Sequence, residues 1–275
     1  MPDSAQPPAV AFEEVAFAFD DHVVLDKISF TVPAGSMRII LGGSGAGKSV
    51  ILKLILGLYR PDAGVIRVNG ERIDNLPERQ LLRLRADIGM LFQETALFDS
   101  LTVEENVGYR LFEELRLPLE QARARVAEVL GFVGLAGLGQ RLPSELSGGQ
   151  RRRVGLARAV AAEPSLLLFD DPTTGLDPVI ASNVNDEIVK LRDLGRATSI
   201  LVTHQIRDAY EIATREVASS NGQVTFRDAS PKTAARVRFM LLRDGRIGFE
   251  GSADELLASE DPYIREFLFN TLPPW

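Results

Sequence analysis

The 275-residue chain is long enough for one large domain or two small ones, with a core that needs no disulfide. Its 31 Lys and Arg against 38 Asp and Glu give a formal charge of −7, which argues against a nucleic-acid partner. The chain has no cysteine, which excludes thiol catalysis, iron–sulfur clusters and thiolate zinc sites. Its two histidines, His22 and His204, leave little room for a histidine-rich metal centre.

The N-terminal half alternates short β-like runs with glycine-containing turns. Residues 1–9 are polar and Pro-rich, lack the basic and apolar regions of a signal peptide, and are expected to be frayed. Two β-like runs follow within 10–32, and 37–43 predicts a buried strand that enters a glycine loop. Residues 49–59 have helical periodicity, and 64–73 predict a hairpin with an Asn-Gly turn.

The C-terminal half is helical over about 95–160 and then alternates again. Continuous apolar runs at 165–169 and 197–203 are typical of strands buried on both faces. Residues 219–236 are polar and predict a loop or an inserted hairpin, whereas 237–251 predict a final hairpin followed by two short helices. No apolar run approaches the roughly 20 residues that span a bilayer. We therefore expect a soluble intracellular α/β protein with a mainly parallel sheet, which reaches a membrane only through a partner.

The loop after the predicted strand 37–43 matches G-x-x-x-x-G-K-[ST], the pattern of phosphate-binding loops. Its glycines let backbone N–H groups converge on phosphate oxygens, and the following helix adds its positive N-terminal end. Lys48 would reach the β- and γ-phosphates, and the Ser49 hydroxyl would bind Mg²⁺. The alternative, a glycine-rich turn with a surface lysine, does not require so close a match. The predicted contacts of the loop are Gly42, Gly43, Ser44, Gly45, Ala46, Gly47, Lys48, Ser49 and Val50.

Two carboxylates follow the buried strand 165–169, at the end of a strand where α/β folds present ligand-binding groups. Asp170 would hold the Mg²⁺ shell, and Asp171 is the candidate base or water-positioning group for attack on the γ-phosphate. An Asp-Asp-Pro turn without function is the alternative, and the nearby phosphate loop weakens it.

A second motif, Leu146-Ser-Gly-Gly-Gln150, precedes this strand and opens a predicted helix. A serine and two glycines at a helix start form a second anion site, although alone they would more often be a capped turn. The combination of the phosphate loop, this motif and the Asp-Asp strand resembles the ATP-binding-cassette (ABC) ATPases. The resemblance covers about 10–255 and places Ser147, Gly148, Gly149 and Gln150 at the nucleotide.

The resemblance implies a phosphate-loop NTPase fold with a RecA-like core, a mainly parallel sheet, an antiparallel β subdomain and a helical ABC subdomain. In this division the core comprises 10–94 and 161–275, the helical subdomain 95–160, and the flexible N-terminus 1–9. It implies ATP and Mg²⁺ as ligands. It also implies a homodimer with two nucleotide sites, each combining the phosphate loop of one subunit with the serine-glycine motif of the other.

Four further residues match positions that the family uses. Gln93 corresponds to the glutamine that senses Mg²⁺ and nucleotide and couples to the membrane partner. Asp177 corresponds to the aspartate that crosses the dimer interface, and His204 to the histidine that contacts the γ-phosphate. Phe19 lies where the family stacks an aromatic ring on adenine, with a core residue as the alternative, and His22 is expected at the surface.

Asp171 departs from the family, which usually has glutamate at this position. The shorter side chain withdraws the carboxylate by about 1.5 Å, and a misplacement of about 1 Å can cost on the order of 100-fold in rate. Either the backbone compensates or hydrolysis is slow.

Two segments resemble the ATPases of Mla/Mce-type lipid transporters: 47–64, and 91–107 with its A-L-F-D-S-L-T-V run. The polar segment after Ala213 and the tail at 260–268 are similar to that group as well, and generic solute-importer residues are the alternative. The group implies an integral membrane permease of the MlaE type, whose coupling helix would enter a groove beside Gln93. It further implies an MCE-domain lipid-binding protein, a STAS-domain protein in some systems, and a place on the cytoplasmic face of the inner membrane.

Three alternatives remain open in the sequence. The aromatic tail forms either a helix packed on its own domain or a clasp on the partner subunit; its aromatic residues are Tyr263, Phe267, Phe269 and Trp275. A cassette ATPase acting on DNA or ribosomes usually carries paired cassettes, coiled coils or zinc cysteines, which this chain lacks. A regulator that uses nucleotide only to dimerise is kept open by Asp171.

Overall fold

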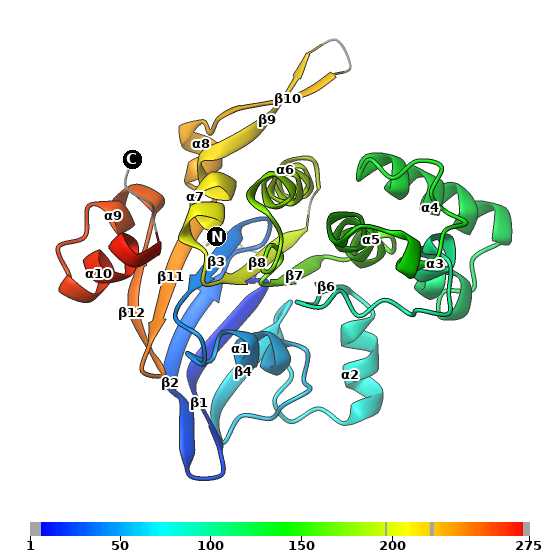
Figure 1. Ribbon diagram of the computed structural model, residues 1–275. Coiled ribbons are helices and arrows are strands. Elements are labelled where there is room, and N and C mark those ends of the chain that lie inside the picture. The colour runs from blue at the N-terminus through cyan, green and yellow to red at the C-terminus, as the bar shows by residue number, and fades with distance from the viewer. Residues whose placement is uncertain (1–6, 196, 221–222, 272–275) are drawn as a thin grey trace, which may run out of the picture.

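The computed structural model describes residues 7–195, 197–220 and 223–271. A six-stranded sheet in the order β12-β11-β3-β8-β7-β6 forms the centre (Figure 1). Five of its strands are parallel, and β12 pairs antiparallel to β11 at the edge. The strands are β3 (Met37–Leu41), β6 (Ile88–Leu91), β7 (Leu166–Asp170), β8 (Thr198–Thr203), β11 (Val237–Arg243) and β12 (Arg246–Gly251). The predicted mainly parallel α/β core is confirmed.

A second, antiparallel sheet covers one face of the central sheet. Its order is β2-β1-β4-β5, and its strands are β1 (Val10–Phe19), β2 (His22–Val32), β4 (Ala63–Val68) and β5 (Glu71–Arg72). Helix α1 (Lys48–Ile55) shares this layer, and its Ile51 packs in one cluster with Phe12 of β1 and Ile40 of β3. This cluster fixes the phosphate loop, because the loop joins β3 to α1.

Helices cover the opposite face of the central sheet. Ile39 and Leu41, which flank Ile40 in β3, contact this helical layer, as the two-residue period of a strand requires. The helices of this layer are α5 (Gly148–Val160), α6 (Pro178–Leu194), α7 (Ile206–Thr214), α9 (Ala253–Leu257) and α10 (Pro262–Thr271). Helices α3 (Val103–Glu113) and α4 (Leu119–Phe132) pack on α5, to the side of the sheet (Figure 1). None of the helices in the described ranges is long and apolar enough to cross a membrane.

Helices α3, α4 and α5 pack together and form the region predicted as the helical subdomain. A reciprocal cap between Thr102 and Glu105 begins α3. Helix α5 also packs on β6 of the central sheet, so it connects the helical subdomain to that sheet. The subdomain boundaries at 94–95 and 160–161 stay a prediction.

Some elements differ from the sequence-based expectation. Helix α2 (Glu78–Arg85) and strand β6 were not predicted, because their segments are short and mostly polar or unpatterned. The helix expected over 49–59 ends at Ile55, where Gly57 with a φ of 62° turns the chain. Of the N-terminal segment 1–9, residues 1–6 lie outside the described residues, so its predicted fraying is untested.

The C-terminal helix α10 packs on its own domain. Ile264 and Leu268 are buried in the helical layer, and Tyr263 and Phe267 pack against it at the edge. Phe269 is 84% exposed, whereas Trp275 lies outside the described residues. The packed alternative is therefore correct for the helix, and a clasp formed by the remaining tail stays a prediction.

The polar segment after α7 forms a hairpin that extends away from both sheets (Figure 1). It consists of β9 (Arg215–Ser220) and β10 (Gln223–Asp228), followed by α8 (Pro231–Ala234). The inserted hairpin, one of the two sequence-based alternatives, is thus correct. An isolated two-stranded ribbon is marginally stable in water, so its root needs anchoring.

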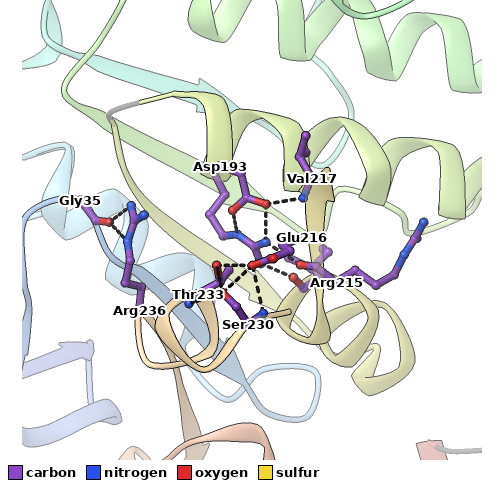
Figure 2. A network of polar contacts seen from close by, with 10 residues as sticks. Gly35, Asp193, Arg215, Glu216, Val217, Ser230, Thr233 and Arg236 are labelled. Atoms are coloured by element: carbon purple, nitrogen blue, oxygen red, sulfur yellow. Dashed lines mark hydrogen bonds and ion pairs between the residues drawn. The ribbon is translucent and has the colours of Figure 1, made fainter. Parts of the chain in front are cut away.

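Glu216 supplies this anchor at the base of β9 (Figure 2). Its Oε2 accepts hydrogen bonds from the Ser230 backbone at 3.0 Å and from the hydroxyls of Ser230 at 2.8 Å and Thr233 at 2.5 Å. These donors, with Arg227 on β10, lower the pKa of Glu216 to about 2. On the other side of β9, Asp193 of α6 accepts from the Val217 backbone at 2.8 Å (Figure 2).

Glu216→Gln should lower the free energy of unfolding at pH 7 and remove part of its pH dependence. The pKa of Glu216 is about 2 in the fold and ordinarily 4.5. Its ionisation therefore stabilises the fold fully above pH 4.5, and this stabilisation is lost as the pH falls toward 2. Urea unfolding at pH 7, 4 and 3 should show the gap between parent and variant narrowing with acid. Glu266→Gln, at an exposed position of α10, is the control; an equal gap at all three pH values would contradict the role of Glu216.

Candidate active site

The phosphate loop joins β3 to α1 and holds Lys48 at the first position of the helix. Gly47 has a φ of 96°, and a Cβ there would lie 3.0 Å from the side chains of Val24 and Leu25, so only glycine fits. The Lys48 side chain is buried, and its Nζ donates to the carbonyls of Gly42 and Gly43, each at 2.9 Å. The loop therefore holds a cation beside the N-terminus of α1, as an anion-binding site requires.

Burial lowers the pKa of Lys48, although the charges of Asp171 and Asp170 act in the opposite direction. A bound phosphate would add negative charge next to the ammonium group and so favour its charged form. Carbonyls use two of its three N–H donors.

Asp170 and Ser49 form the candidate magnesium position. The Ser49 hydroxyl donates to Oδ1 of Asp170 at 2.9 Å, so a hydroxyl and a carboxylate oxygen meet at the carboxyl end of β7. Burial raises the pKa of Asp170, whereas the Ser49 hydrogen bond and Lys48 act to lower it. Hard oxygen ligands suit Mg²⁺, which usually keeps waters and substrate phosphates in its shell. Among the described residues, no group of three or more His, Cys, Asp or Glu side chains is placed to hold a metal ion.

Asp171 lies beside His204 rather than pointing freely into solvent. Its Oδ1 accepts a hydrogen bond from the His204 backbone at 3.2 Å and lies 2.9 Å from Nδ1 of the His204 ring. Asp171 itself has a φ of 42°, a left-handed conformation that is unusual for a non-glycine residue. If Nδ1 donates to the carboxylate, Nε2 of His204 is free to accept a proton or contact a ligand.

The serine-glycine motif begins α5 at a different place. Ser147 and Gln150 cap the helix reciprocally, with Ser147 Oγ accepting from the Gln150 backbone at 3.2 Å. A Cβ on Gly149 would lie 2.3 Å from Cγ2 of Ile180, so the motif packs directly against α6. Asp177 caps α6 by accepting from the backbones of Val179 and Ile180.

The structure thus groups the predicted site residues into two clusters. The first, at the carboxyl ends of β3, β7 and β8, contains Lys48, Ser49, Asp170, Asp171 and His204. The second, at the N-termini of α5 and α6, contains Ser147, Gly148, Gly149, Gln150 and Asp177. In the described parts of the chain, no hydrogen bond or ion pair joins the two clusters.

The remaining predicted residues lie at the surface. Gln93 is exposed in the loop after β6, and His22 is exposed at the start of β2. Phe19 is 45% exposed, so the core alternative for this residue is wrong. Its ring makes edge contacts with Phe17 at 4.9 Å and Tyr59 at 5.5 Å between centroids, which leaves its outer face open.

Two arginines of α5, Arg152 and Arg158, were not predicted as functional residues. They donate to backbone carbonyls of the loop between β6 and α3, residues 92–102, here called the Gln93 loop. The run of three arginines at 151–153 in a helix that packs on the sheet was the available signal. Charged residues in such a helix are seldom buried unless they are paired.

Phe19→Ala should weaken ATP binding about tenfold, because stacking on a base contributes about 1–3 kcal/mol. Isothermal titration calorimetry would measure the dissociation constant, with a thermal melt to confirm that the half-exposed side chain is dispensable for folding. Phe269→Ala on α10 is the matched exposed control. An unchanged affinity in the Phe19 variant would place the adenine elsewhere.

Comparison with known proteins shows the family to which the chain belongs. The sequence model of the ABC transporter family matches residues 25–174. The intermembrane phospholipid transport system ATP-binding protein MlaF of Escherichia coli K12 is 36% identical over 259 residues, covering 94% of this chain and 88% of MlaF. The methionine import ATP-binding protein MetN of Corynebacterium jeikeium is 42% identical over 229 residues, covering 80% of this chain but 62% of MetN.

A solved dimeric ATP-binding cassette in a post-hydrolysis state, bound to ADP and Pi, superposes with a TM-score of 0.73 at 28% identity. The match covers 88% of this chain and 98% of that one. The chain belongs to the ABC transporter family and has the ABC ATPase cassette fold. It is an ATPase cassette that uses ATP with Mg²⁺.

Proposed function

We propose that this chain is the ATPase subunit of a transporter that moves phospholipid or a related lipid between membranes. The observation that carries the proposal is the match to MlaF, which extends over nearly the whole of both chains. The match to MetN is higher in identity but leaves more than a third of that importer unmatched. The segments 47–64 and 91–107 also resemble the lipid-transport group.

In the proposed reaction, Lys48 and the loop amides bind the β- and γ-phosphates at the N-terminus of α1. Ser49 and Asp170 would hold Mg²⁺, which supplies charge neutralisation at the phosphates. Asp171 orients the attacking water and accepts its proton, and His204 fixes the position of this carboxylate through Nδ1. Gln93, which is exposed, would sense the bound Mg²⁺ and nucleotide.

The active unit of the proposal is a homodimer. The phosphate-loop cluster and the Ser147 cluster share no hydrogen bond or ion pair among the described residues, which supports a nucleotide site completed by a second subunit. A head-to-tail second copy would bring its Ser147–Gln150 motif to the phosphate loop and place Asp177 at the interface.

The membrane partner in the proposal is an MlaE-type permease, which would hold the chain at the cytoplasmic face of the inner membrane. Aromatic side chains are exposed next to Gln93: Phe92 at 39%, Phe98 at 45% and Tyr109 at 39%. Phe98 and Tyr109 contact each other at 5.0 Å between ring centroids. Such a cluster fits an amphipathic coupling helix. An MCE-domain protein and, in some systems, a STAS-domain protein would complete the assembly, without nucleic acid.

The test is ATP turnover in reconstituted complexes. The chain is combined either with an MlaE-type permease and MCE protein in phospholipid vesicles, or with a methionine-importer permease and methionine. We expect several-fold stimulation in the lipid complex alone. Stimulation only by the importer permease would favour the second candidate, a solute-import ATPase, which the MetN identity supports. Turnover that neither permease changes would favour a regulatory ATPase.

A further inference from the structure

Three consecutive arginines of α5 point in three directions, because successive residues of a helix are about 100° apart. Arg151 donates to the carbonyl of Leu146 at 2.5 Å, and Arg153 to the carbonyl of Val133 at the end of α4 at 3.1 Å. Arg152 between them turns inward and is only 6% exposed. A buried guanidinium is costly unless its donors are used, so its partners matter.

The partners of Arg152 belong to two different loops. One terminal nitrogen donates to the carbonyls of Phe92, at 3.2 Å, and Gln93 in the loop after β6. The other donates to the carbonyl of Thr174, at 3.2 Å, in the loop after Asp171. One planar side chain therefore spans both loops from the helix that begins with Ser147.

Thr174 is itself connected to the catalytic side of the site. Its backbone N–H donates to the carbonyl of Asp171 at 3.3 Å, and its hydroxyl lies 3.4 Å from the side-chain amide of Gln205, which follows His204. A displacement of the Thr174 carbonyl would thus be felt by the segment that carries the Asp171–His204 pair.

Helix α5 has little freedom to shift relative to the Gln93 loop. A Cβ on Gly155 would lie 2.7 Å from Cδ1 of Leu91, the residue that ends β6. Farther along the same loop, Arg158 donates to the carbonyls of Thr95 at 2.6 Å and Ala96 at 2.7 Å.

Thr95 and Ala96 both have positive φ, at 61° and 47°. Two adjacent left-handed residues are strained, and surrounding structure must hold them in place. The Gln93 loop is therefore clamped to α5 at both ends, by Arg152 and by Arg158.

We propose that Arg152 is a positioning residue for ATP hydrolysis. It ties the Gln93 loop to the loop between β7 and α6, residues 171–177 (the Asp171 loop), so that the two loops move together. The inference rests on the proposed roles of Gln93 and Asp171. Moving the Gln93 loop alone would take the carbonyls of Phe92 and Gln93 away from one terminal nitrogen of the buried guanidinium, and an unpaired buried donor is costly. The contact of Gln93 with nucleotide or permease is thereby transmitted to the carboxylate that orients water.

Arg158 provides the matched control, because it holds the same loop but has no bond to residues 171–177 within the described ranges. The full-length chain is compared as Arg152→Gln, Arg152→Lys, Arg158→Gln and parent. Hydrogen–deuterium exchange of the peptides covering 92–96 and 171–177 measures whether the two loops are linked, and it does not depend on ATP turnover. Initial rates over ATP concentration separate kcat from KM, and thermal melting monitors folding.

In the Arg152→Gln variant we expect faster exchange in both peptides and a kcat reduced by about 10- to 100-fold, with the KM for ATP within about threefold. Arg152→Lys should recover only part of the kcat, since one ammonium cannot span both loops. Arg158→Gln should speed exchange at 92–96 alone and change kcat less.

Unchanged exchange at 171–177 in Arg152→Gln would overturn the proposal, as would full recovery of kcat by lysine. Equal losses of kcat in the Arg152 and Arg158 variants, in proportion to the decrease in their melting temperatures, would also overturn the proposal, because they would show a merely structural role. Failure of the proposed role of Asp171, on which the inference rests, has a different signature. It would appear as an Asp171→Asn variant with normal turnover, whereas the exchange result would still report whether Arg152 links the loops.

Discussion

Asp171→Asn should lower kcat for ATP hydrolysis by about 100- to 1,000-fold, because a positioned general base contributes about 10²- to 10⁴-fold. Asparagine keeps the shape of the side chain and its carbonyl can still accept the His204 backbone hydrogen bond, now 3.2 Å long. It loses the negative charge that would accept a proton from water. ATP affinity should stay within about threefold, since Lys48 and the loop amides bind the phosphates. Phosphate release measures kcat, and calorimetry measures affinity.

Asp171→Glu is the informative companion, because the family usually has glutamate here. In the parent chain the short carboxylate is fixed by the His204 backbone and ring. If this places the attacking water less well than glutamate would, the variant should hydrolyse ATP faster than the parent. An equal or lower rate would show that the local backbone, with Asp171 at a φ of 42°, already compensates. An asparagine variant as fast as the parent would remove Asp171 from the reaction.

The parts of the site that are built from residues close in sequence could be predicted from the sequence. The phosphate loop depends on glycines and a lysine within eight residues, and the Ser147–Gln150 cap closes within four. Asp170 and Asp171 follow a run of buried apolar residues whose position at a sheet edge is set by the fold class. Each of these features combines a short motif with a neighbouring strand or helix.

The connections between distant segments could not be predicted in the same way. Arg152 lies about 60 residues from the carbonyls of Phe92 and Gln93, which carry no side-chain signal of their own. The hairpin β9–β10 was ambiguous because its stability comes from the contacts of Glu216 with Ser230 and Thr233 rather than from a core pattern. Strand β6 is only four residues long and gains its identity from pairing with β7.

Mixing two inactive variants should restore ATP hydrolysis if each nucleotide site is shared between two chains. Lys48→Ala removes the phosphate-binding cation, and Ser147→Arg places a bulky charge at the α5 cap; each homodimer should lose at least about 100-fold in turnover. In a mixed dimer, one site combines both defects. The other combines the intact phosphate loop of the Ser147→Arg chain with the intact motif of the Lys48→Ala chain.

Random pairing of equal amounts makes half of the dimers mixed, each with one good site of two, so the mixture should regain about a quarter of the parent activity. Phosphate release measures the recovery, and native mass spectrometry of differently tagged chains verifies that mixed dimers form. The control mixes the parent with a chain carrying both substitutions, whose mixed dimers have one defect at each site and should be inactive. Verified mixed dimers without recovery would contradict independent shared sites. Recovery in the control equal to simple dilution of the parent would show that each chain completes its own site, because only separate sites survive pairing with a defective chain.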